Sequence, residues 1–206
     1  MKKRYWIFGA FILLAVAQIA VSASRIRKWE DVLRTGTQFR LRTVPVDPYD
    51  AFRGRYVALN FKEETVSLEL GPELKRGEEV YALFQKDEDG FGRIEKLVKD
   101  RPSEGIYLRI KVYYPGQSDN EIHLRFPFER FYLEEEIAPA AEQAYESRSE
   151  DDKRDAYVTV RIKNGYGVLE NLFIAGKPIV EFLRDEKETE KKKGEGIVNP
   201  GNQGEE

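Results

Sequence analysis

The longest uncharged run of the chain lies at its start. Residues 5–22 carry no charged side chain. Basic residues flank this run on both sides: Lys2, Lys3, Arg4, Arg25, Arg27 and Lys28. At about 1.5 Å per residue, a helix over this run is roughly 27 Å long, close to the thickness of the hydrocarbon core of a bilayer. The run therefore predicts a single transmembrane helix that contacts membrane lipid through residues 5–22.

The same run has features of a secretory signal peptide. Small residues around Ser22 and Ala23 would suit a signal peptidase that cuts before Ser24. The run is longer than the usual signal core of about 7–15 residues, which favours an uncleaved anchor. A buried core helix is the third alternative. For an anchor, we expect Trp6 and Trp29 near the two membrane interfaces.

Orientation is weakly encoded, because three basic residues flank each side of the run. The α-amino group adds a positive charge to the N-terminal side. We therefore expect a single-pass protein of the cytoplasmic membrane, with its domain on the periplasmic or extracellular side.

The chain beyond the anchor shows the period-two alternation of strands with one buried face. Apolar and polar residues alternate in five runs: residues 39–42, 56–61, 108–112, 121–126 and 157–162. Three turn dipeptides separate neighbouring apolar runs: Asp89-Gly90, Pro115-Gly116 and Asn164-Gly165. Such dipeptides predict hairpins. The fold class is therefore mainly β, an antiparallel barrel-like or sandwich-like domain.

Helical spacing predicts one short helix within this domain, over residues 139–148. Its apolar face holds four residues: Ala140, Ala141, Ala144 and Tyr145. A second helix over residues 27–34 would continue the anchor into the domain. The last 23 residues are charged and almost without apolar side chains, which predicts disorder. The predicted organisation is an anchor over 1–28, a β-rich domain over 29–183 and a disordered tail over 184–206.

Composition excludes several classes of function. The chain has 34 basic and 37 acidic residues, with a net charge of −3, so it lacks the basic excess of a nucleic-acid-binding protein. It has no cysteine, which excludes disulfides, thiolate metal sites and thiol catalysis. With His123 as its one histidine, a zinc site would need carboxylate ligands almost throughout. We expect no metal site and no cofactor.

Residues 43–61 are the densest in side chains that shape a loop. Two prolines stop any helix there, and Asp47 and Asp50 can accept hydrogen bonds from nearby backbone N–H groups. Arg53 and Gly54 then lead directly into the strand that begins near Tyr56. Two interpretations remain open at this point. The segment either only builds an ordered loop, or it also presents a recognition surface to another protein.

This segment resembles the GDYXXLXY family. The motif residues Gly54, Tyr56 and Leu59 are present, and Phe61 stands where the pattern has tyrosine. Residues 130–138 (RFYLEEEIA) and 172–179 (LFIAGKPI) are similar to later blocks of the family. The resemblance implies a short membrane-anchored bacterial protein, many relatives of which are encoded beside multi-pass membrane proteins. It supplies no catalytic residues.

One position departs from the family motif. Arg55 replaces the motif aspartate. Any role that depends on that carboxylate, such as cation binding or proton transfer, would therefore be lost or changed in this chain.

The sequence thus favours a non-enzymatic function. We expect a binding or assembly module that docks with another membrane or envelope protein, with a multi-pass protein as the partner that the resemblance implies. Its candidate contact or support residues are Asp47, Asp50, Arg53, Gly54, Tyr56, Leu59 and Phe61. The alternatives are a secreted binding protein released by signal cleavage and an envelope hydrolase that uses carboxylates. The hydrolase would need a cleft with two acidic groups of perturbed pKa.

Overall fold

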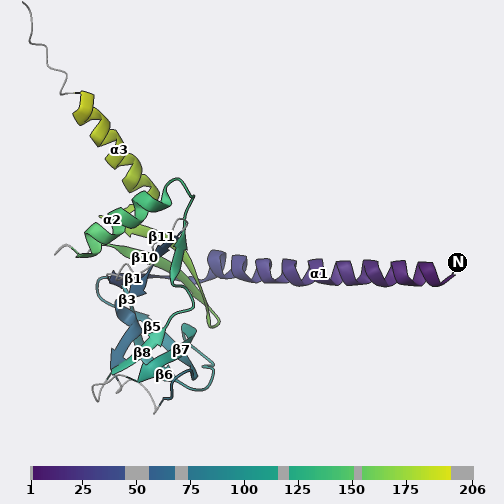
Figure 1. Cartoon of the computed structure of the whole chain (residues 1–206). Helices are drawn as coiled ribbons and strands as arrows, with labels where there is room; N and C mark the ends of the chain where they lie inside the picture. The colour runs from purple at the N-terminus through teal and green to yellow at the C-terminus, as the bar shows by residue number, and fades with distance from the viewer. Residues whose placement is uncertain (1, 45–55, 68–73, 116–120, 151–154, 196–206) are drawn as a thin grey trace, which may run out of the picture.

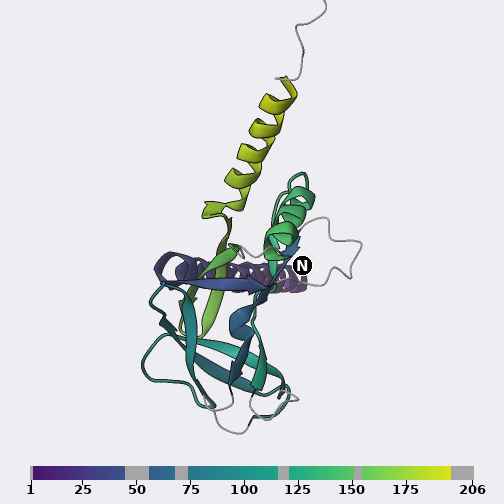
Figure 2. The same cartoon turned by 90° about the vertical axis from the view of Figure 1, so that its left-hand side faces the viewer.

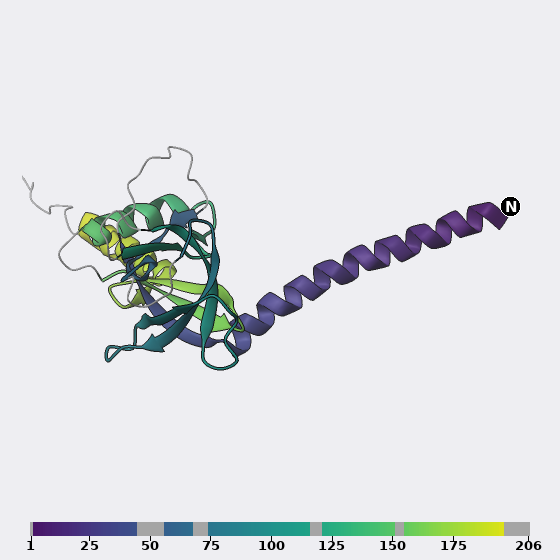
Figure 3. The same ribbon diagram turned by 90° about the horizontal axis from the view of Figure 1, so that it is seen from below.

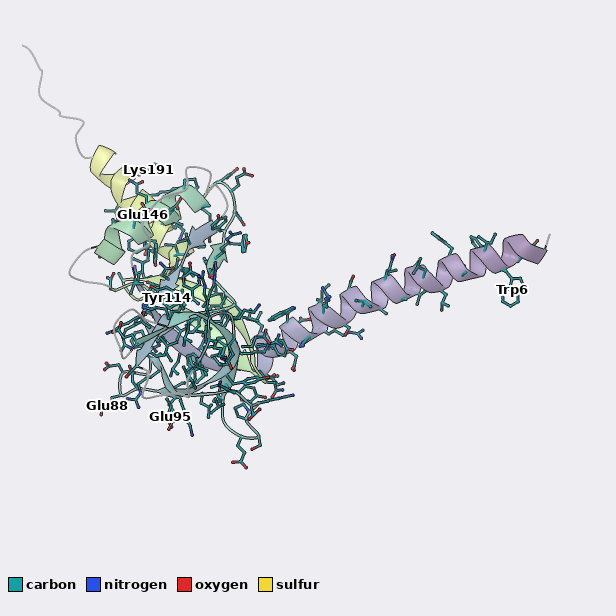
Figure 4. All side chains as sticks on the ribbon, turned by 60° about the horizontal axis from the view of Figure 1, so that its bottom comes forward. Trp6, Glu88, Glu95, Tyr114, Glu146 and Lys191 are labelled. Atoms are coloured by element: carbon teal, nitrogen blue, oxygen red, sulfur yellow. The ribbon has the colours of Figure 1, made fainter. Side chains whose placement is uncertain are left out.

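A helix of 34 residues leads into the domain. The computed structural model describes residues 2–44, 56–67, 74–115, 121–150 and 155–195. Helix α1 (Lys2–Thr35) projects from the domain as a rod, with Trp6 near its free end (Figure 3, Figure 4). Trp6 is 82% exposed, and the other large apolar side chains of this half are exposed too. In the described chain, one helix is long and apolar enough to cross a membrane, Tyr5–Thr35, and a signal sequence would pass the same test.

The domain is a nearly closed, mainly antiparallel, barrel-like sheet, as the sequence predicts (Figure 1). One five-stranded sheet has the order β12-β11-β10-β1-β3, and the other has the order β4-β8-β7-β5-β6. Strands β2 and β9 form a separate pair. The strands are β1 (Thr37–Val44), β2 (Tyr56–Ala58), β3 (Asn60–Phe61), β4 (Thr65–Ser67), β5 (Glu79–Lys86), β6 (Gly92–Val98), β7 (Tyr107–Pro115), β8 (Glu121–Arg125), β9 (Arg130–Tyr132), β10 (Tyr157–Lys163), β11 (Tyr166–Ile174) and β12 (Lys177–Pro178). A short 3-10 helix, η1 (Lys62–Glu64), precedes β4.

Two isolated bridges join the sheets into the barrel. Arg40 of β1 pairs with Phe91, and Leu108 of β7 pairs with Gly165. At the second bridge, the N–H of Gly165 donates to the carbonyl oxygen of Tyr107 at 3.1 Å, and the N–H of Arg109 donates to the carbonyl oxygen of Gly165 at 3.0 Å. The tip of the β10–β11 hairpin is therefore held against β7.

The alternating runs bury one face, as predicted. Their apolar side chains form one continuous core: Phe39, Leu41, Val57, Leu59, Phe61, Leu108, Ile110, Val112, Ile122, Leu124, Phe126, Val158, Val160 and Ile162. Burial of this apolar area is the main favourable contribution to folding. The period of two thus gives the correct inward face in all five runs.

The three predicted hairpins join antiparallel neighbours. Asn164 (φ 52°) and Gly165 (φ 85°) form a two-residue turn, the geometry for which this dipeptide is favoured. The β5–β6 loop is longer than two residues, and within it the Asp87 side chain accepts bonds from the N–H groups of Asp89 and Phe91. Residues 116–120, in the third hairpin, lie outside the described residues.

Helices α2 (Ala138–Glu150) and α3 (Ile179–Glu195) contact each other at one end of the barrel (Figure 2). This end lies away from the sheet with the order β4-β8-β7-β5-β6. Helix α2 confirms the predicted helix and buries Ala141 and Tyr145. The Tyr145 hydroxyl donates to the carbonyl oxygen of Val44 at 3.1 Å. The predicted helix over 27–34 is also present, as the end of α1.

Helix α3 corrects the prediction of disorder from residue 184. It extends to Glu195, well into the charged tail. Its first turns bury Ile179, Phe182 and Leu183 against the domain. These contacts nucleate a helix, and the glutamates and lysines that follow are good helix formers that can propagate it. Residues 196–206 lie outside the described residues.

Candidate functional site

The family motif is only partly within the described chain. Asp47, Asp50, Arg53 and Gly54 lie outside the described residues, as does Arg55. Of the remaining motif positions, Tyr56 lies in β2, Phe61 lies in β3, and Leu59 lies between the two strands.

Leu59 and Phe61 point into the barrel core. Leu59 is 1% exposed and Phe61 is 3% exposed. The Phe61 ring packs against Phe126 and Phe128, with centroids 5.5 and 5.7 Å away. The Leu59 N–H donates to the carbonyl oxygen of Glu129 at 2.9 Å. These two motif residues therefore support the fold and present no surface to a ligand.

Tyr56 is the described motif residue that reaches the surface. It pairs with Tyr132 across β2 and β9, and the two ring centroids lie 5.8 Å apart. The guanidinium carbon of Arg130 lies 4.6 Å from the centre of the Tyr56 ring. Tyr132 is 66% exposed. Tyr56, Arg130 and Tyr132, the surface triad, thus form an exposed cluster of two aromatic rings and one cation.

A groove of about 590 Å³ connects two members of this triad, Arg130 and Tyr132, with the base of α1. Its lining comes from α1, from the segment that ends in β9, and from β11: Trp29, Phe126, Pro127, Phe128, Glu129, Arg130, Tyr132, Gly167, Val168 and Leu169. Trp29 is 44% exposed, and its ring stands edge-on to Tyr166 at 5.7 Å. The groove therefore places exposed aromatic side chains from α1 and from β9, the partner strand of the motif, along one hollow.

Gly167 lines the groove at a point where β11 packs closely against neighbouring side chains. A Cβ at this position would lie 2.6 Å from Cε1 of Phe128 and 2.9 Å from Cδ1 of Leu108. Both distances are far below ordinary van der Waals contact. The absence of a side chain at Gly167 thus lets β11 approach the aromatic segment closely.

Sequence reasoning missed Arg130, Tyr132 and Trp29 as members of one site. The signal for the first two was their place in the family-like block RFYLEEEIA. No local sequence pattern places Trp29 beside them, because that proximity depends on where α1 meets the barrel.

Two neighbouring carboxyls in η1 have perturbed pKa values. Burial raises the pKa of Glu63 to about 7, against the opposing effects of backbone N–H donors and Arg42. Burial also raises the pKa of Glu64, whose Oε1 accepts from the Phe126 N–H at 2.9 Å and whose Oε2 accepts from the Phe61 N–H at 3.2 Å. Both oxygens of Glu64 are thus used by the backbone.

One carboxylate oxygen of Glu63 also accepts a hydrogen bond from the backbone. Its Oε1 accepts from the Arg42 N–H at 3.3 Å and lies 3.8 Å from Nη1 of Arg42. Its Oε2 is buried and has no hydrogen-bond partner within the described chain. The pair is therefore built into the junction of β1, η1 and β8, where it ties strands together.

Among the described residues, no three His, Cys, Asp or Glu side chains form a group that could hold a metal ion. The ring of His123 stacks on Tyr114 at 4.5 Å, and its Nδ1 lies 3.2 Å from Oγ1 of Thr65. This histidine is half-buried and belongs to a strand-to-strand contact between β8, β7 and β4.

Comparison with known proteins identifies the family. The model of the family described as GDYXXLXY protein matches residues 18–172, which is more than half of the chain. The chain belongs to the GDYXXLXY family. The matched segment begins within α1, so it includes the base of the helix with Trp29, the motif strands, β9 and most of β11. No curated protein and no solved structure matches the chain.

Proposed function

We propose that this protein is a membrane-tethered binding module that docks another membrane protein in the groove beside its anchor. The observation that carries this proposal is the groove itself. It joins Trp29, on the anchor helix, to Arg130 and Tyr132, which contact the family-motif residue Tyr56.

The lining has the composition of a protein interface. Tryptophan, tyrosine and arginine are enriched among residues that dominate binding energy, especially around hollows that exclude water. Trp29 and Tyr132 are large side chains left substantially exposed. Their exposure has a cost in the isolated domain that a docked partner would remove.

The position of the groove along α1 indicates the class of partner. Trp29 follows the end of the apolar run at Ser22 by seven residues, or roughly 10 Å along the helix. In an inserted anchor the groove would open close to the membrane surface, on the periplasmic or extracellular side. A membrane protein whose loop or juxtamembrane segment lies at that height is the partner within reach.

The hydrolase alternative is less well supported. Its expected feature, two acids of perturbed pKa, is present at Glu63 and Glu64. However, three of their four oxygens accept backbone N–H bonds, and neither carboxyl lines the groove. Such carboxyls are better suited to holding strands than to exchanging protons with a substrate.

Site-specific photocrosslinking in the native membrane tests the docking proposal. A photoreactive benzoylphenylalanine replaces Tyr132, and in a matched control it replaces Tyr114, a 37% exposed tyrosine on β7 outside the groove. We expect one discrete adduct with an integral membrane protein from position 132 and none from position 114. The adduct should disappear in the Trp29→Ala variant while the chain remains in the membrane fraction.

Three outcomes would contradict the proposal. Equal adducts from positions 132 and 114 would show unselective contact. An adduct that contains two copies of this chain would replace the partner with self-association. A mature N-terminus at Ser24 would remove the anchor altogether, and sequencing of the purified protein detects it.

A further inference from the structure

A second hollow lies at the base of α1 and has a different chemistry. It measures about 390 Å³ and lies between the helix, the β10–β11 turn and strands β5 and β7. Its lining is Lys28, Asp31, Val32, Tyr81, Arg101, Arg109, Lys163, Asn164, Gly165 and Tyr166. Four of these side chains are basic and one is acidic, although the chain as a whole has a net charge of −3. We call this hollow the basic pocket.

Among the residues that the structure describes, two of the four basic side chains contact tyrosines and not carboxylates. Nζ of Lys28 lies 3.5 Å from the centre of the Tyr166 ring, and Nε of Arg101 donates to the Tyr107 hydroxyl at 2.8 Å. Neither cation has a carboxylate partner within the described chain, whose ion pairs involve other bases. Their charge therefore remains available to an anion in the pocket.

The other two cations are partly neutralised. Lys163 pairs with Asp31 at 2.7 Å, a contact that also ties the hairpin to α1. Arg109 lies 3.8 Å from Glu79, with both side chains about half exposed, so this pair is weak. The Lys28 ammonium also lowers the pKa of the Tyr166 hydroxyl by hydrogen bonding to it, as expected beside excess positive charge.

With residues 5–22 in the hydrocarbon core, the basic pocket lies at the outer edge of the lipid headgroup layer. Lys28 follows Ser22 by six residues, or roughly 9 Å along α1. Each polar headgroup layer of a bilayer is about 5–8 Å thick outside the hydrocarbon core. With residues 5–22 in the core, Lys28 would lie at the outer edge of that layer, and its flexible stem can turn towards the phosphates.

We propose that the basic pocket binds the phosphate of an anionic phospholipid headgroup. This inference rests on the membrane insertion of α1 assumed in the proposed function, but not on the docking groove. A lipid suits the site better than free phosphate because the bilayer holds lipid headgroups within reach of the Lys28 side chain, which gives them a high local concentration. The guanidinium groups of Arg101 and Arg109 offer the planar donors that suit phosphate oxygens.

Tryptophan fluorescence of the full chain in neutral detergent micelles tests the proposal. The chain has two tryptophans, so the Trp6→Phe background leaves Trp29, 5.7 Å from Tyr166, as the reporter. The probes are short-chain phosphatidylglycerol, short-chain phosphatidylcholine and inorganic phosphate. We expect a saturable change with phosphatidylglycerol at a concentration at least tenfold lower than with either other probe.

Charge-removing variants locate the binding. Arg101→Gln and Lys28→Gln should each weaken phosphatidylglycerol binding by about fivefold, the effect of one basic side chain near an anionic lipid. The matched control is Lys187→Gln on α3, which projects from another side of the barrel and should change nothing (Figure 1). Circular dichroism of each variant verifies its fold.

Each remaining outcome would overturn the proposal. Equal weakening by Lys187→Gln would show unspecific charge attraction. Saturation by inorganic phosphate at the same concentration would assign the pocket to a free anion. No preference over phosphatidylcholine would exclude an anionic headgroup. Because these titrations need no partner protein, their failure is distinct from failure of the crosslinking experiment.

Discussion

The two charged regions of this barrel use their charges in opposite ways. In η1, the carboxylates of Glu63 and Glu64 turn inward and accept bonds from the backbone of neighbouring strands. At the base of α1, Lys28 and Arg101 lie on tyrosines at the rim of a hollow. The first arrangement leaves one buried oxygen without a partner, and the second leaves cationic charge facing solvent.

This difference separates residues that stabilise the fold from residues that are available to a ligand, and both kinds lie within the segment that matches the family. A polar group whose bonds all go to the chain contributes to the fold. A charged or aromatic side chain with spare capacity beside a hollow is available to a ligand. The same division runs through the motif itself, because Leu59 and Phe61 are buried whereas Tyr56 joins the surface triad.

The largest expected effect tests the inward half of the motif. Leu59→Ala removes a fully buried side chain and should lower the free energy of unfolding by about 2–5 kcal/mol. Asn60→Ala, its exposed neighbour on β3, is the control and should change it by less than about 0.5 kcal/mol. Denaturant unfolding of the full chain in micelles measures both. Similar values for the two variants would refute the supporting role of Leu59.

A smaller loss is expected from Gly167→Ala at the floor of the groove. The added Cβ must displace Phe128 or Leu108, and overpacking of this kind costs about 1–3 kcal/mol. Gly9→Ala on exposed α1, where a Cβ meets nothing within 4 Å, is the matched control and should be neutral or slightly stabilising. Thermal unfolding compares the two. An unchanged melting temperature for Gly167→Ala would mean that β11 is not closely packed there.

The sequence predicted the helices and strands better than the contacts between them. Alternation identified the inward face of every run that was singled out, because the period of two depends only on local geometry. The length and composition of residues 5–22 predicted α1 in the same way. The groove and the basic pocket depend on where α1 meets the barrel, and the basic pocket also depends on the bridge between Leu108 and Gly165. That contact joins residues 57 positions apart in the chain, and no local pattern reports it.

The charged tail shows the same limit from the other direction. Composition predicted disorder from Arg184, yet α3 reaches Glu195. The first turns of the helix hold Phe182 and Leu183, which are buried by tertiary contacts that composition does not reveal.

A pH-dependent effect of intermediate size tests whether burial of the Glu63 carboxylate destabilises the folded state. Its folded pKa of about 7 exceeds the ordinary value of 4.5, so the folded state binds its proton more tightly than the unfolded state. This group therefore favours folding most below about pH 4.5, and that contribution is lost as the pH rises to about 7. Glu63→Gln should be more stable than the wild type above pH 7 by up to about 3 kcal/mol, the free energy that corresponds to a pKa raised from 4.5 to about 7.

The decisive measurement is the pH dependence of the difference in stability between Glu63→Gln and the wild type. The stability advantage of Glu63→Gln should shrink steadily between about pH 7 and pH 5. Glu95→Gln, at an exposed position of β6, provides the comparison and should give a flat difference. A flat profile for Glu63→Gln would show that its carboxyl is not destabilised by burial. Loss of stability at every pH would show that its bonds to Arg42 outweigh the cost of its charge.

The smallest expected effect concerns the outward-facing cation Lys28. Lys28→Gln removes its contact with the Tyr166 ring and should change the free energy of unfolding by only about 0.5 kcal/mol. It should nevertheless raise the pKa of Tyr166 back towards the ordinary value of 10, because the hydrogen bond from Lys28 is the main cause of the lowered pKa. NMR of ring-labelled tyrosine, assigned with Tyr166→Phe, follows this titration. Arg34→Gln, on the same helix and paired with Glu30, should leave the Tyr166 titration unchanged. A large loss of stability without a change in the Tyr166 pKa would place Lys28 among the supporting residues and remove the contrast between the two regions.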